Sequence, residues 1–498
     1  MMSSINRRNP LREGLMSDKV VVRMAPSPTG FLHVGTARTT IFNYLFARHH
    51  QGKFIIRVED TDVERSSEEM TAAILEALKW LKIDWDGEVY YQSDRFAIYK
   101  EYAEKLHQEG KAYYCFCSPE ELRARREQAL AEKRSLGYDR RCLNLSEQQR
   151  AELDSRGILK ALRIKTPQTG TARFIDIVGG ELTRDFGELD DWVIMRADGR
   201  CTYNFSCVVD DHLMEISHVI RGNDHIANTF KQQTIYDAFG WEKPQFAHVP
   251  LILGKDRAKI SKRHGAISVA DYQEDGILPE ALFNFLALLG WSAGDDREIM
   301  TRQELIESFS LERINASNPI FDPVKLEWMN FEYIQKLDDN ELLERARWVL
   351  INAGLTTRLS VESHWQWHLK VIHLMRERMK TLNDLPRLGR FFYTDDFDYD
   401  EKGVKKHFAD PDTAQRLKQW HDELAGVEDD FGASKIESAL RKLADNLGIN
   451  PSAIIHPTRL ALTGMTGGPG LFELMELLGK EKCLARIDRA IDYVKGVS

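Results

Sequence analysis

The segment at residues 25–36, APSPTGFLHVGT, lies between a short apolar run and a stretch of helical spacing. The run at 20–22 is typical of a buried strand, and apolar side chains after position 36 recur at helical intervals. A glycine-containing turn that joins a strand to a helix is a common phosphate-binding arrangement in α/β proteins. This segment therefore predicts an α/β nucleotide-binding domain with its ligand at the start of the first helix.

A second segment, KISKR at 259–263, carries three cations in five positions on a predicted loop with a glycine at either end. Alone, each segment is more often a proline-rich turn or an exposed basic loop, so their joint presence in this order carries the prediction of one ATP site. Neither is a Walker loop, because Gly-x4-Gly-Lys-Ser/Thr does not occur in the chain, and Gly-x-Gly-x-x-Gly does not occur either. Ordinary kinases and dehydrogenases are therefore poor candidates.

Further motifs accompany these two segments and narrow the function. They are RMAPSPTG at 23–30, HVGT at 33–36, RVEDTD at 57–62, YNF at 203–205, VIRG at 219–222, KISKR at 259–263 and LTGMTGGPGLFEL at 462–474. In this order they resemble the signatures of bacterial-type glutamyl-tRNA synthetases, which are class I aminoacyl-tRNA synthetases. The resemblance runs from about Val20 to the C-terminus, which leaves little room for coincidence.

The resemblance implies an α/β Rossmann-like nucleotide-binding catalytic domain with an inserted α/β acceptor-binding domain, followed by all-α C-terminal anticodon-binding domains. The pattern agrees with this fold class, because strand-like and helical stretches alternate at first and helical spacing dominates after about residue 330. We expect strands at 20–22, 54–58, 171–178 and 191–196, and helices at 70–82 and 436–447. The expected boundaries are a disordered leader at 1–16, the first catalytic half at 17–110, the inserted tRNA acceptor-end-binding domain at 111–202, the second catalytic half at 203–265, a stem-contact region at 266–330 and an all-helical anticodon-binding region at 331–498.

Adenylation of a carboxylate needs positive charge around the phosphates, because an oxygen attacks the α-phosphate of ATP as pyrophosphate leaves. By resemblance, the catalytic residues are His33, Lys259 and Lys262. The histidine would donate to phosphate oxygens near a helix start, and the lysines would stabilise the departing phosphates. The expected ATP-binding residues are Thr29, Gly30, His33, Gly35, Asp224, Lys259, Ser261 and Lys262, with Mg²⁺ as the accompanying ion.

Two arginines at predicted strand ends suit a substrate with two carboxylates. Arg23 and Arg221 can each bind one carboxylate bidentately, and Glu59 would pair with the α-ammonium group. The alternative is that each arginine forms an ordinary surface ion pair. The resemblance implies that the glutamate pocket consists of Arg23, Ala25, Ser27, Glu59, Tyr203 and Arg221. Cys207 stands where certain relatives have asparagine, which leaves a side-chain contact at Cys207 in doubt.

The Asp-Thr-Asp motif at 60–62 allows two interpretations. Its side chains would orient the terminal ribose of tRNA or a magnesium ion, or they would cap the N-terminus of the predicted helix at 70–82. Both interpretations stay open from the sequence.

A metal-like pattern lies in the predicted insertion. Cys115 and Cys117 are followed by Cys142, and family members with zinc supply Cys-x-Cys and Cys-x-His in this region. Asn144 stands where the histidine would be and is a poor zinc ligand, whereas Tyr138 could serve instead. The group is therefore either a zinc site of three cysteines and Tyr138 or a set of buried reduced thiols.

The net charge of −9 is unusual for a tRNA-binding protein, because phosphate contacts need lysine and arginine. For tRNA binding, the local distribution of charge matters more than the net charge. Residues 123–165 carry twelve cationic side chains against six acidic ones. This stretch is either a contact surface for tRNA-Glu or a solvated helical hairpin. In the helical C-terminal third, Arg376, Arg378 and Lys380 are candidate phosphate contacts.

No apolar run approaches the roughly 20 residues of a membrane helix, and no signal peptide is visible. We therefore expect a cytoplasmic monomer without a membrane partner.

The expected activity is glutamate–tRNA ligation through a glutamyl-adenylate. The rivals are a glutaminyl-tRNA synthetase, which would have His-Ile-Gly-His and a β-rich C-terminal region, and a silent tRNA-binding paralogue, which would not need a loop that handles pyrophosphate. A truncated glutamyl-queuosine tRNA-Asp synthetase would resemble only the catalytic part, and charging of tRNA-Gln stays open.

Overall fold

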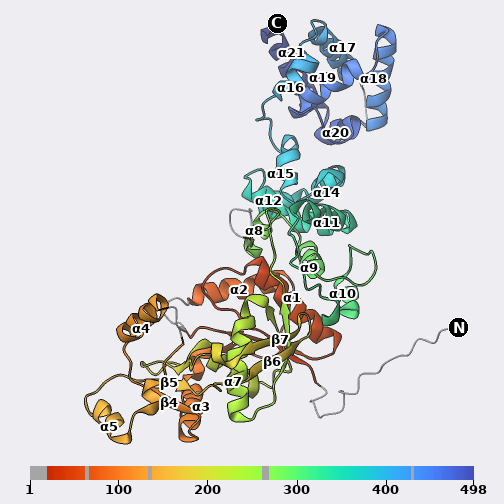
Figure 1. The fold of residues 1–498 in the computed structure, drawn as a ribbon. Helices are drawn as coiled ribbons and strands as arrows, with labels where there is room; N and C mark the ends of the chain where they lie inside the picture. The colour runs from red at the N-terminus through yellow and green to blue at the C-terminus, as the bar shows by residue number, and fades with distance from the viewer. Residues whose placement is uncertain (1–18, 62–66, 133–136, 261–267, 428–430, 498) are drawn as a thin grey trace, which may run out of the picture. The chain divides into compact units, whose positions relative to one another are not determined.

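The computed structural model describes residues 19–61, 67–132, 137–260, 268–427 and 431–497 (Figure 1). They form two compact units. The first unit contains the residues up to 272 together with 282–322, and the second contains 273–281 together with the residues from 323 onward. The predicted leader at 1–16 lies outside the described residues.

A parallel sheet begins the first unit. Its strands are β1 (Val21–Met24), β2 (Lys53–Val58) and β3 (Tyr90–Tyr91), in the spatial order β1-β2-β3. Helix α1 (Val34–His49) connects β1 with β2, and α2 (Glu68–Trp80) follows β2. Strands β1 and β2 are almost wholly buried, as expected for parallel strands that are covered on both faces. The predicted strands at 20–22 and 54–58 and the predicted helix at 70–82 are confirmed.

A second sheet continues the first. It has the order β7-β6-β10-β9, with β6 (Thr171–Asp176), β7 (Gly180–Asp185), β9 (His218–Gly222) and β10 (Gln245–Val249). Strands β6, β10 and β9 are parallel, and β6 and β7 form an antiparallel hairpin. The Val21 amide donates to the Ser217 hydroxyl at 2.9 Å, and the Ser217 amide donates to the Val21 carbonyl at 3.0 Å, which places β1 beside β9. The strand order therefore reverses between β1 and β9, where open α/β sheets bind ligands.

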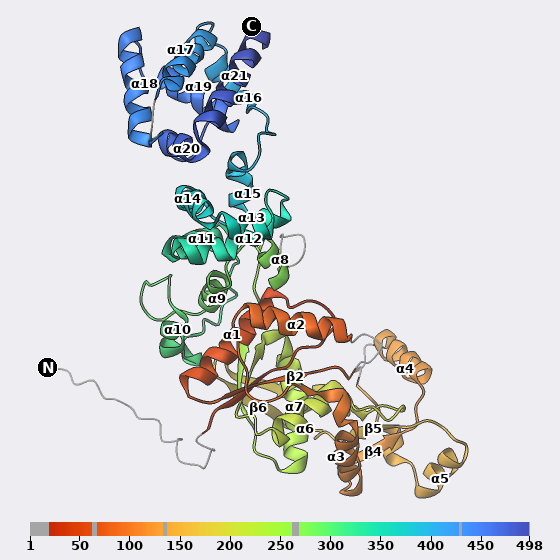
Figure 2. The ribbon, with the colours of Figure 1, turned by 180° about the vertical axis from the view of Figure 1, so that it is seen from behind.

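Helices cover both sides of these strands (Figure 2). Helices α1 and α2 lie on one side, and α6 (Tyr203–Leu213) and α7 (Ile226–Phe239) lie on the other. Right-handed crossovers produce this arrangement, because β1–α1–β2 and β9–α7–β10 lead away from the point of reversal in opposite directions. Buried side chains such as Val219, Phe230 and Phe246 form the core beneath α7. The predicted Rossmann-like architecture is confirmed.

A third sheet is antiparallel and lies in the region predicted as an insertion. Its order is β4-β5-β8, with β4 (Ala112–Cys115), β5 (Ala161–Ile164) and β8 (Val193–Met195). The helices of this region are α4 (Pro119–Ala131) and α5 (Glu147–Ser155), and α3 (Phe96–Gln108) precedes it in the chain. The domain boundaries stay a prediction. Within 111–202, however, the β6–β7 hairpin pairs with β10, so this part of the chain adds two strands to the sheet that carries β9.

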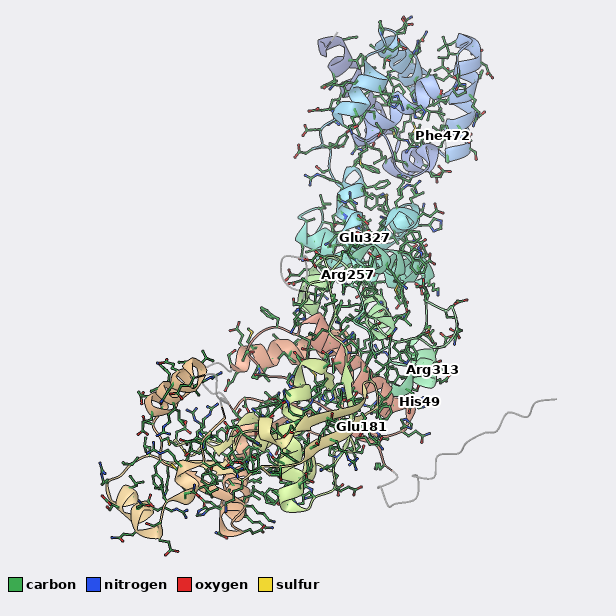
Figure 3. All side chains as sticks on the ribbon, in the orientation of Figure 1. His49, Glu181, Arg257, Arg313, Glu327 and Phe472 are labelled. Carbon is green, nitrogen blue, oxygen red and sulfur yellow. The ribbon has the colours of Figure 1, made fainter. Side chains whose placement is uncertain are left out.

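Three short helices follow the second sheet in sequence. They are α8 (Val269–Glu274), α9 (Pro279–Leu288) and α10 (Arg302–Ser308). His49, labelled in Figure 3, lies at the end of α1, and its Nδ1 is 2.8 Å from the Ile306 carbonyl. The guanidinium of Arg302 lies 3.9 Å from the centre of the Phe283 ring. The first contact attaches α10 to α1, and the second attaches it to α9.

The second unit is helical, and no strand occurs among its described residues. Its longer helices are α11 (Pro323–Lys336), α12 (Asp339–Asn352), α14 (Trp365–Met375), α17 (Thr413–Ala425), α18 (Ala433–Leu447), α19 (Ser452–Thr463), α20 (Leu471–Leu478) and α21 (Lys480–Val497). Shorter ones are α13 (Arg358–Ser363), α15 (Asp384–Leu388) and α16 (Glu401–Gly403). The predicted helix at 436–447 lies within α18. Across the described part of the chain, no helix has the length and apolar character needed to span a membrane.

Candidate active site

A cavity of about 740 Å³ lies at the carboxyl ends of β1 and β9. Its wall contains the residues after β1, the start of α1, the end of β9 and residues 250–252 after β10. It includes all six residues predicted to bind glutamate, which are Arg23, Ala25, Ser27, Glu59, Tyr203 and Arg221. It also includes His33, Gly35, Asp224 and Lys259 from the predicted ATP site. The structure thus brings groups from distant segments into one cavity.

Two described residues that were predicted to bind ATP are not in this wall. Thr29 and Gly30 lie in the turn before α1, where the Thr29 amide donates to the Ser27 carbonyl at 2.9 Å. Ser261 and Lys262 lie outside the described residues, so their roles stay predictions.

His33 begins α1, and a backbone hydrogen bond determines which of its nitrogens carries the proton. Its Nδ1 accepts from the Gly35 amide at 3.0 Å. Burial lowers the pKa of His33, and the charge of Lys259 lowers it further, so the ring is neutral near pH 7. Because Nδ1 is the acceptor, Nε2 carries the proton and can donate to a phosphate oxygen.

Lys259 and Asp224 provide opposite charges at the cavity. The Lys259 Nζ lies 3.6 Å from an Asp224 oxygen, and the two side chains are 62% and 48% exposed. An ion pair this exposed contributes little stability, so a ligand can replace it at small cost. Lys259 is therefore available to a polyphosphate.

Arg23 is buried and is already paired. Its Nε and Nη2 donate to the two carboxylate oxygens of Asp211, at 3.1 and 3.3 Å. Arg57 donates to the same carboxylate at 2.7 Å and to Glu59 at 3.3 Å. Burial alone would raise the pKa of Asp211, but the two arginines lower it to about 2. The alternative of a surface ion pair is wrong for Arg23, because both partners are buried.

Arg221 is buried too, but no carboxylate among the described residues pairs with it. Its Nε donates to the His248 ring at 3.3 Å, and its Nη2 donates to the Thr229 hydroxyl at 2.6 Å and the Gln232 side-chain carbonyl at 2.8 Å. Its Nη1 is buried and has no acceptor in the described part of the protein. A buried guanidinium without a counter-charge is costly, so this N–H group marks a place for an anionic ligand.

Glu59 and Tyr203 complete the wall near the arginines. The Glu59 side chain is 9% exposed, and burial raises its pKa although Arg57 works in the opposite direction. The Tyr203 hydroxyl lies 3.2 Å from Nδ1 of His225. Burial lowers the pKa of His225 to about 4, so this ring is neutral near pH 7. His225 therefore adds no positive charge to this part of the cavity near pH 7.

Asp60 and Thr61 of the Asp-Thr-Asp motif do not cap α2. Ser67 is the N-cap, and its hydroxyl accepts from the amide three residues later at 3.0 Å. Asp60 accepts instead from the amide and the hydroxyl of Ser93, at 2.8 and 2.6 Å. The capping interpretation is therefore wrong for Asp60 and Thr61, because a serine directly before the helix is the N-cap. Thr61 lines the cavity, and Asp62 lies outside the described residues.

Several residues of the wall were not predicted from the sequence. Thr39, Thr40 and Asn43 follow the HVGT motif at helical spacing and form a polar face of α1 within otherwise apolar sequence, a signal that could have identified them. Arg196 and Asn228 have no comparable local signal, because only the tertiary fold brings them to the cavity. Cys207 is buried outside the wall, and its Sγ accepts from Arg57 at 3.4 Å.

The three cysteines predicted as zinc ligands come together. The Sγ atoms of Cys115, Cys117 and Cys142 all lie within 4.8 Å of one another. The Tyr138 hydroxyl lies 3.3 Å from Cys115 Sγ and 3.5 Å from Cys117 Sγ. Tetrahedral zinc with Zn–S bonds of about 2.3 Å needs sulfur atoms roughly 3.8 Å apart, so this donor set fits a zinc ion. Hydrogen bonds among the thiols lower the pKa of Cys115 and raise the pKa of Cys117, so the group shares its protons unequally.

The basic residues predicted to contact tRNA have acidic neighbours in the second unit. Arg376 donates to Asp339 at 2.6 Å, and the Lys380 Nζ lies 3.3 Å from Glu327, which Figure 3 labels. The Arg378 guanidinium lies 3.9 Å from the preceding glutamate. In the stretch at 123–165, Arg125 pairs with Asp139 and Arg163 is buried. Contacts of these residues with tRNA stay predictions.

Comparison with known proteins covers both units. Residues 19–328 match the family described as tRNA synthetases class I (E and Q), catalytic domain, and residues 341–491 match an anticodon binding domain. Over 486 residues the chain is 45% identical to the glutamate–tRNA ligase of Desulforudis audaxviator and 46% identical to that of Moorella thermoacetica. These alignments cover 96% of this chain and 97% and 99% of the relatives. A solved glutamate tRNA ligase from Elizabethkingia meningosepticum, in complex with its amino acid, is 34% identical with a TM-score of 0.87. The structural match covers 96% of this chain and 100% of the solved ligase.

The reversed strand order, the cavity and the domain matches define a class I aminoacyl-tRNA synthetase of the glutamate and glutamine group. The relatives match both units at high identity. The chain belongs to the glutamate–tRNA ligase family.

Proposed function

We propose that this chain joins glutamate to tRNA-Glu in two ATP-dependent steps. A carboxylate oxygen of glutamate attacks the α-phosphorus of ATP, which releases pyrophosphate and leaves glutamyl-adenylate. A hydroxyl of the terminal adenosine of tRNA then attacks the acyl carbon, and AMP leaves. The observation that carries this proposal is the buried Nη1 of Arg221, which lacks an acceptor among the described residues and belongs to the same cavity as His33 and Lys259.

The start of α1 is the proposed site for the phosphates of ATP. The first backbone amides of the helix and the Nε2–H group of His33 are donors for phosphate oxygens. Lys259 stabilises the negative charge that develops as pyrophosphate leaves. Asp224, directly after β9, is the proposed acceptor for a ribose hydroxyl of ATP. Mg²⁺ bound with the nucleotide supplies further neutralisation of phosphate charge.

Glutamate is recognised by the buried arginines in this proposal. Arg221 offers Nη1 to one substrate carboxylate, and Arg23 adds a second positive charge. Glu59 pairs with the α-ammonium group in its ionised form. Because burial raises the pKa of Glu59, this pairing weakens as the pH falls through that raised value.

The second unit is proposed to bind the anticodon region of tRNA-Glu, and the acceptor end is proposed to reach the catalytic cavity. The match of residues 341–491 to an anticodon binding domain supports the first assignment. The class I family supports transfer to the 2′-hydroxyl of the terminal adenosine.

The test is charging of purified tRNA-Glu and tRNA-Gln with radiolabelled glutamate and ATP, beside a parallel reaction with glutamine. Glutamate on tRNA-Glu supports the proposal, and glutamate on tRNA-Gln as well would identify a non-discriminating enzyme. Charging with glutamine instead would favour a glutaminyl-tRNA synthetase. Binding of tRNA without charging of either would leave the silent paralogue as the better account.

We also propose that Cys115, Cys117, Tyr138 and Cys142 hold one zinc ion. The ion would fix the segments that carry these residues, because structural zinc contributes directly to folding. The measurement is metal content after gentle purification, compared with a Cys142→Ser variant. About one zinc per chain in the wild type and much less in the variant is expected, whereas less than about a tenth of a zinc per wild-type chain would end the proposal.

We further propose that the protein acts as a monomer in the cytoplasm, where protein synthesis consumes charged tRNA. Light scattering during size-exclusion chromatography tests the first part. A mass near 57.4 kDa supports a monomer, and about twice that mass contradicts it.

A further inference from the structure

Arg221 contacts His248, which forms a buried pair with Asp176, and neither residue of the pair lines the cavity. Asp176 ends β6 and His248 lies on β10, which pairs with β6. One oxygen of Asp176 lies 2.6 Å from Nδ1 of His248. On the other side of the ring, Nε2 lies 3.3 Å from Arg221 Nε and 2.9 Å from the Thr229 hydroxyl. A single imidazole thus connects a buried carboxylate with the arginine assigned to the substrate.

Asp176 determines which nitrogen of His248 carries the proton. Burial alone would raise the pKa of Asp176, but hydrogen bonds from His248 and from the backbone amides of Val178 and Gly179 lower it, so the carboxylate is ionised. Burial lowers the pKa of His248, so the ring is neutral. A neutral ring beside an ionised carboxylate, which only accepts, carries its proton on Nδ1 and leaves Nε2 as an acceptor.

An acceptor at Nε2 is what the edge of Arg221 requires. The Arg221 Nε–H donates to it. The Thr229 hydroxyl oxygen accepts from Arg221 Nη2 at 2.6 Å, and its one proton has two acceptors within reach, His248 Nε2 at 2.9 Å and the His225 carbonyl at 3.3 Å. Gln232 accepts a second hydrogen bond from Nη2 at 2.8 Å. Neutral groups therefore hold the Nε–Nη2 edge of the guanidinium, while Nη1 has no acceptor among the described residues. With the proton on Nε2 instead, two donors would face each other.

We propose that Asp176 and His248 are positioning residues for glutamate recognition. Asp176 keeps the His248 proton on Nδ1, and Nε2 then holds Arg221 so that Nη1 is presented to a substrate carboxylate. Both residues act through Arg221, because neither lines the cavity. The proposal rests on the proposed function, since it assigns a role in the binding of glutamate.

Substitutions at these two positions separate the role from simple packing. His248→Gln keeps a side-chain oxygen long enough to accept from Arg221. His248→Asn ends earlier, beside Asp176, and leaves Arg221 Nε without an acceptor. Asp176→Asn presents an amide donor toward Nδ1, which drives the ring proton to Nε2. Asp185→Asn, an exposed change on the same hairpin, is the matched control.

The experiment measures initial rates of tRNA-Glu charging against glutamate and, separately, against ATP. We expect the KM for glutamate to rise about tenfold or more in Asp176→Asn and His248→Asn, because a hydrogen bond to a charged group is lost. The KM for ATP should stay within about twofold in both variants, since the phosphate site does not use this pair. His248→Gln and Asp185→Asn should keep a KM for glutamate within about threefold of the wild type.

The outcomes distinguish this proposal from the function on which it rests. A folded wild-type protein that charges no tRNA with glutamate refutes the proposed function. If the wild type is active, an equal KM for glutamate in His248→Gln and His248→Asn overturns the positioning role. A parallel rise in the KM for glutamate and for ATP, which general distortion would produce, also overturns it. If thermal melts show that Asp176→Asn is not folded, the comparison of His248→Gln with His248→Asn still tests the positioning role.

Discussion

At the scale of single residues, two arginines in one cavity differ in the groups that hold them. Arg23 donates two N–H groups to the carboxylate of Asp211. Arg221 is held by an imidazole, a hydroxyl and an amide, none of which carries a negative charge. A guanidinium whose charge is not neutralised by the protein gains more from an anionic ligand. We therefore assign Arg221 the main part in carboxylate recognition and Arg23 a supporting one.

Arg221→Lys tests this assignment. Lysine keeps the charge but loses the planar guanidinium and its hydrogen bonds to the neighbouring side chains. The KM for glutamate should therefore rise about tenfold or more, while the KM for ATP should change little. Steady-state charging gives both values. Arg173→Lys, an exposed position on β6, is the control. An unchanged KM for glutamate in Arg221→Lys would contradict the assignment.

His368, in the second unit, makes stability depend on pH. It is 2% exposed, its Nδ1 lies 3.3 Å from the Tyr393 hydroxyl, and burial lowers its pKa from 6.5 to about 4. Below pH 6.5 the unfolded chain binds a proton at this position, whereas the folded protein does not until about pH 4. The contribution of neutral His368 to stability is therefore complete above pH 6.5 and decreases as the pH falls toward 4.

Thermal unfolding from about pH 7.5 down to about pH 4.5 measures this effect. His368→Gln should show a smaller decrease in melting temperature over that range than the wild type. His373→Gln, at an exposed position on the same helix, should follow the wild type. Equal decreases in the wild type and His368→Gln would sink the explanation.

At the scale of elements, the sequence predicted those whose signals are local. Strand β2 and helix α18 lie where apolar periodicity placed them, because burial of one face requires that spacing. The strand expected at 171–178 is also present as β6, but its parallel partner β10 lies far along the chain. Pairing of this kind depends on the whole unit and leaves no local pattern. Asp176 was therefore not predicted as a functional residue, because its contact with His248 depends on the pairing of β6 with β10.

The candidate site shows the same division. Residues in compact motifs, such as His33 and Lys259, were identified because type and spacing together signal nucleotide chemistry. The partners of the two buried arginines were not identifiable, because Asp211 and Thr229 contact these arginines only after helices α6 and α7 have packed on the sheet. The helix cap stayed undecided for a different reason, since the segment before α2 offers several side chains that can accept, and Ser67 is the one that caps the helix.

Helix α21 depends on one buried arginine, Arg486. It is 3% exposed and donates to the carbonyls of Leu462 and Phe391, at 2.6 and 2.8 Å, and to Asp395 at 2.6 Å. Arg486→Met would fill much of the volume but leave both carbonyls without this donor, so we expect a loss of about 3 kcal/mol. Urea unfolding measures it, with the exposed Arg441→Met on α18 as the control. A loss similar to that of the control would contradict the role given to Arg486.

At the scale of the whole molecule, an acidic chain has to bind a polyanion. The net charge is −9, and exposed cations such as Arg125 and Lys380 lie beside acidic side chains. Exposed ion pairs contribute little, so phosphates can replace the acidic partners, with release of counterions from tRNA. Binding must then depend on local groups of cations, since the total charge opposes it.

Salt dependence tests this view of tRNA binding. The affinity for tRNA-Glu, measured by fluorescence titration, should fall roughly tenfold or more between about 50 and 200 mM salt. The melting temperature of the protein over the same range serves as a control for folding. An affinity that does not change with salt would exclude a binding surface built from phosphate contacts.

The manner in which Arg221 is held also bears on how two nearly isosteric amino acids are told apart. With Nη1 assigned to the side-chain carboxylate, glutamine in the same place has an amide that could accept a hydrogen bond from Nη1, yet it would leave the guanidinium charge uncompensated in a buried place. Only a carboxylate cancels that charge. Rejection of glutamine then requires no steric barrier, because the protein leaves a buried positive charge uncompensated and only glutamate has the negative charge that compensates it.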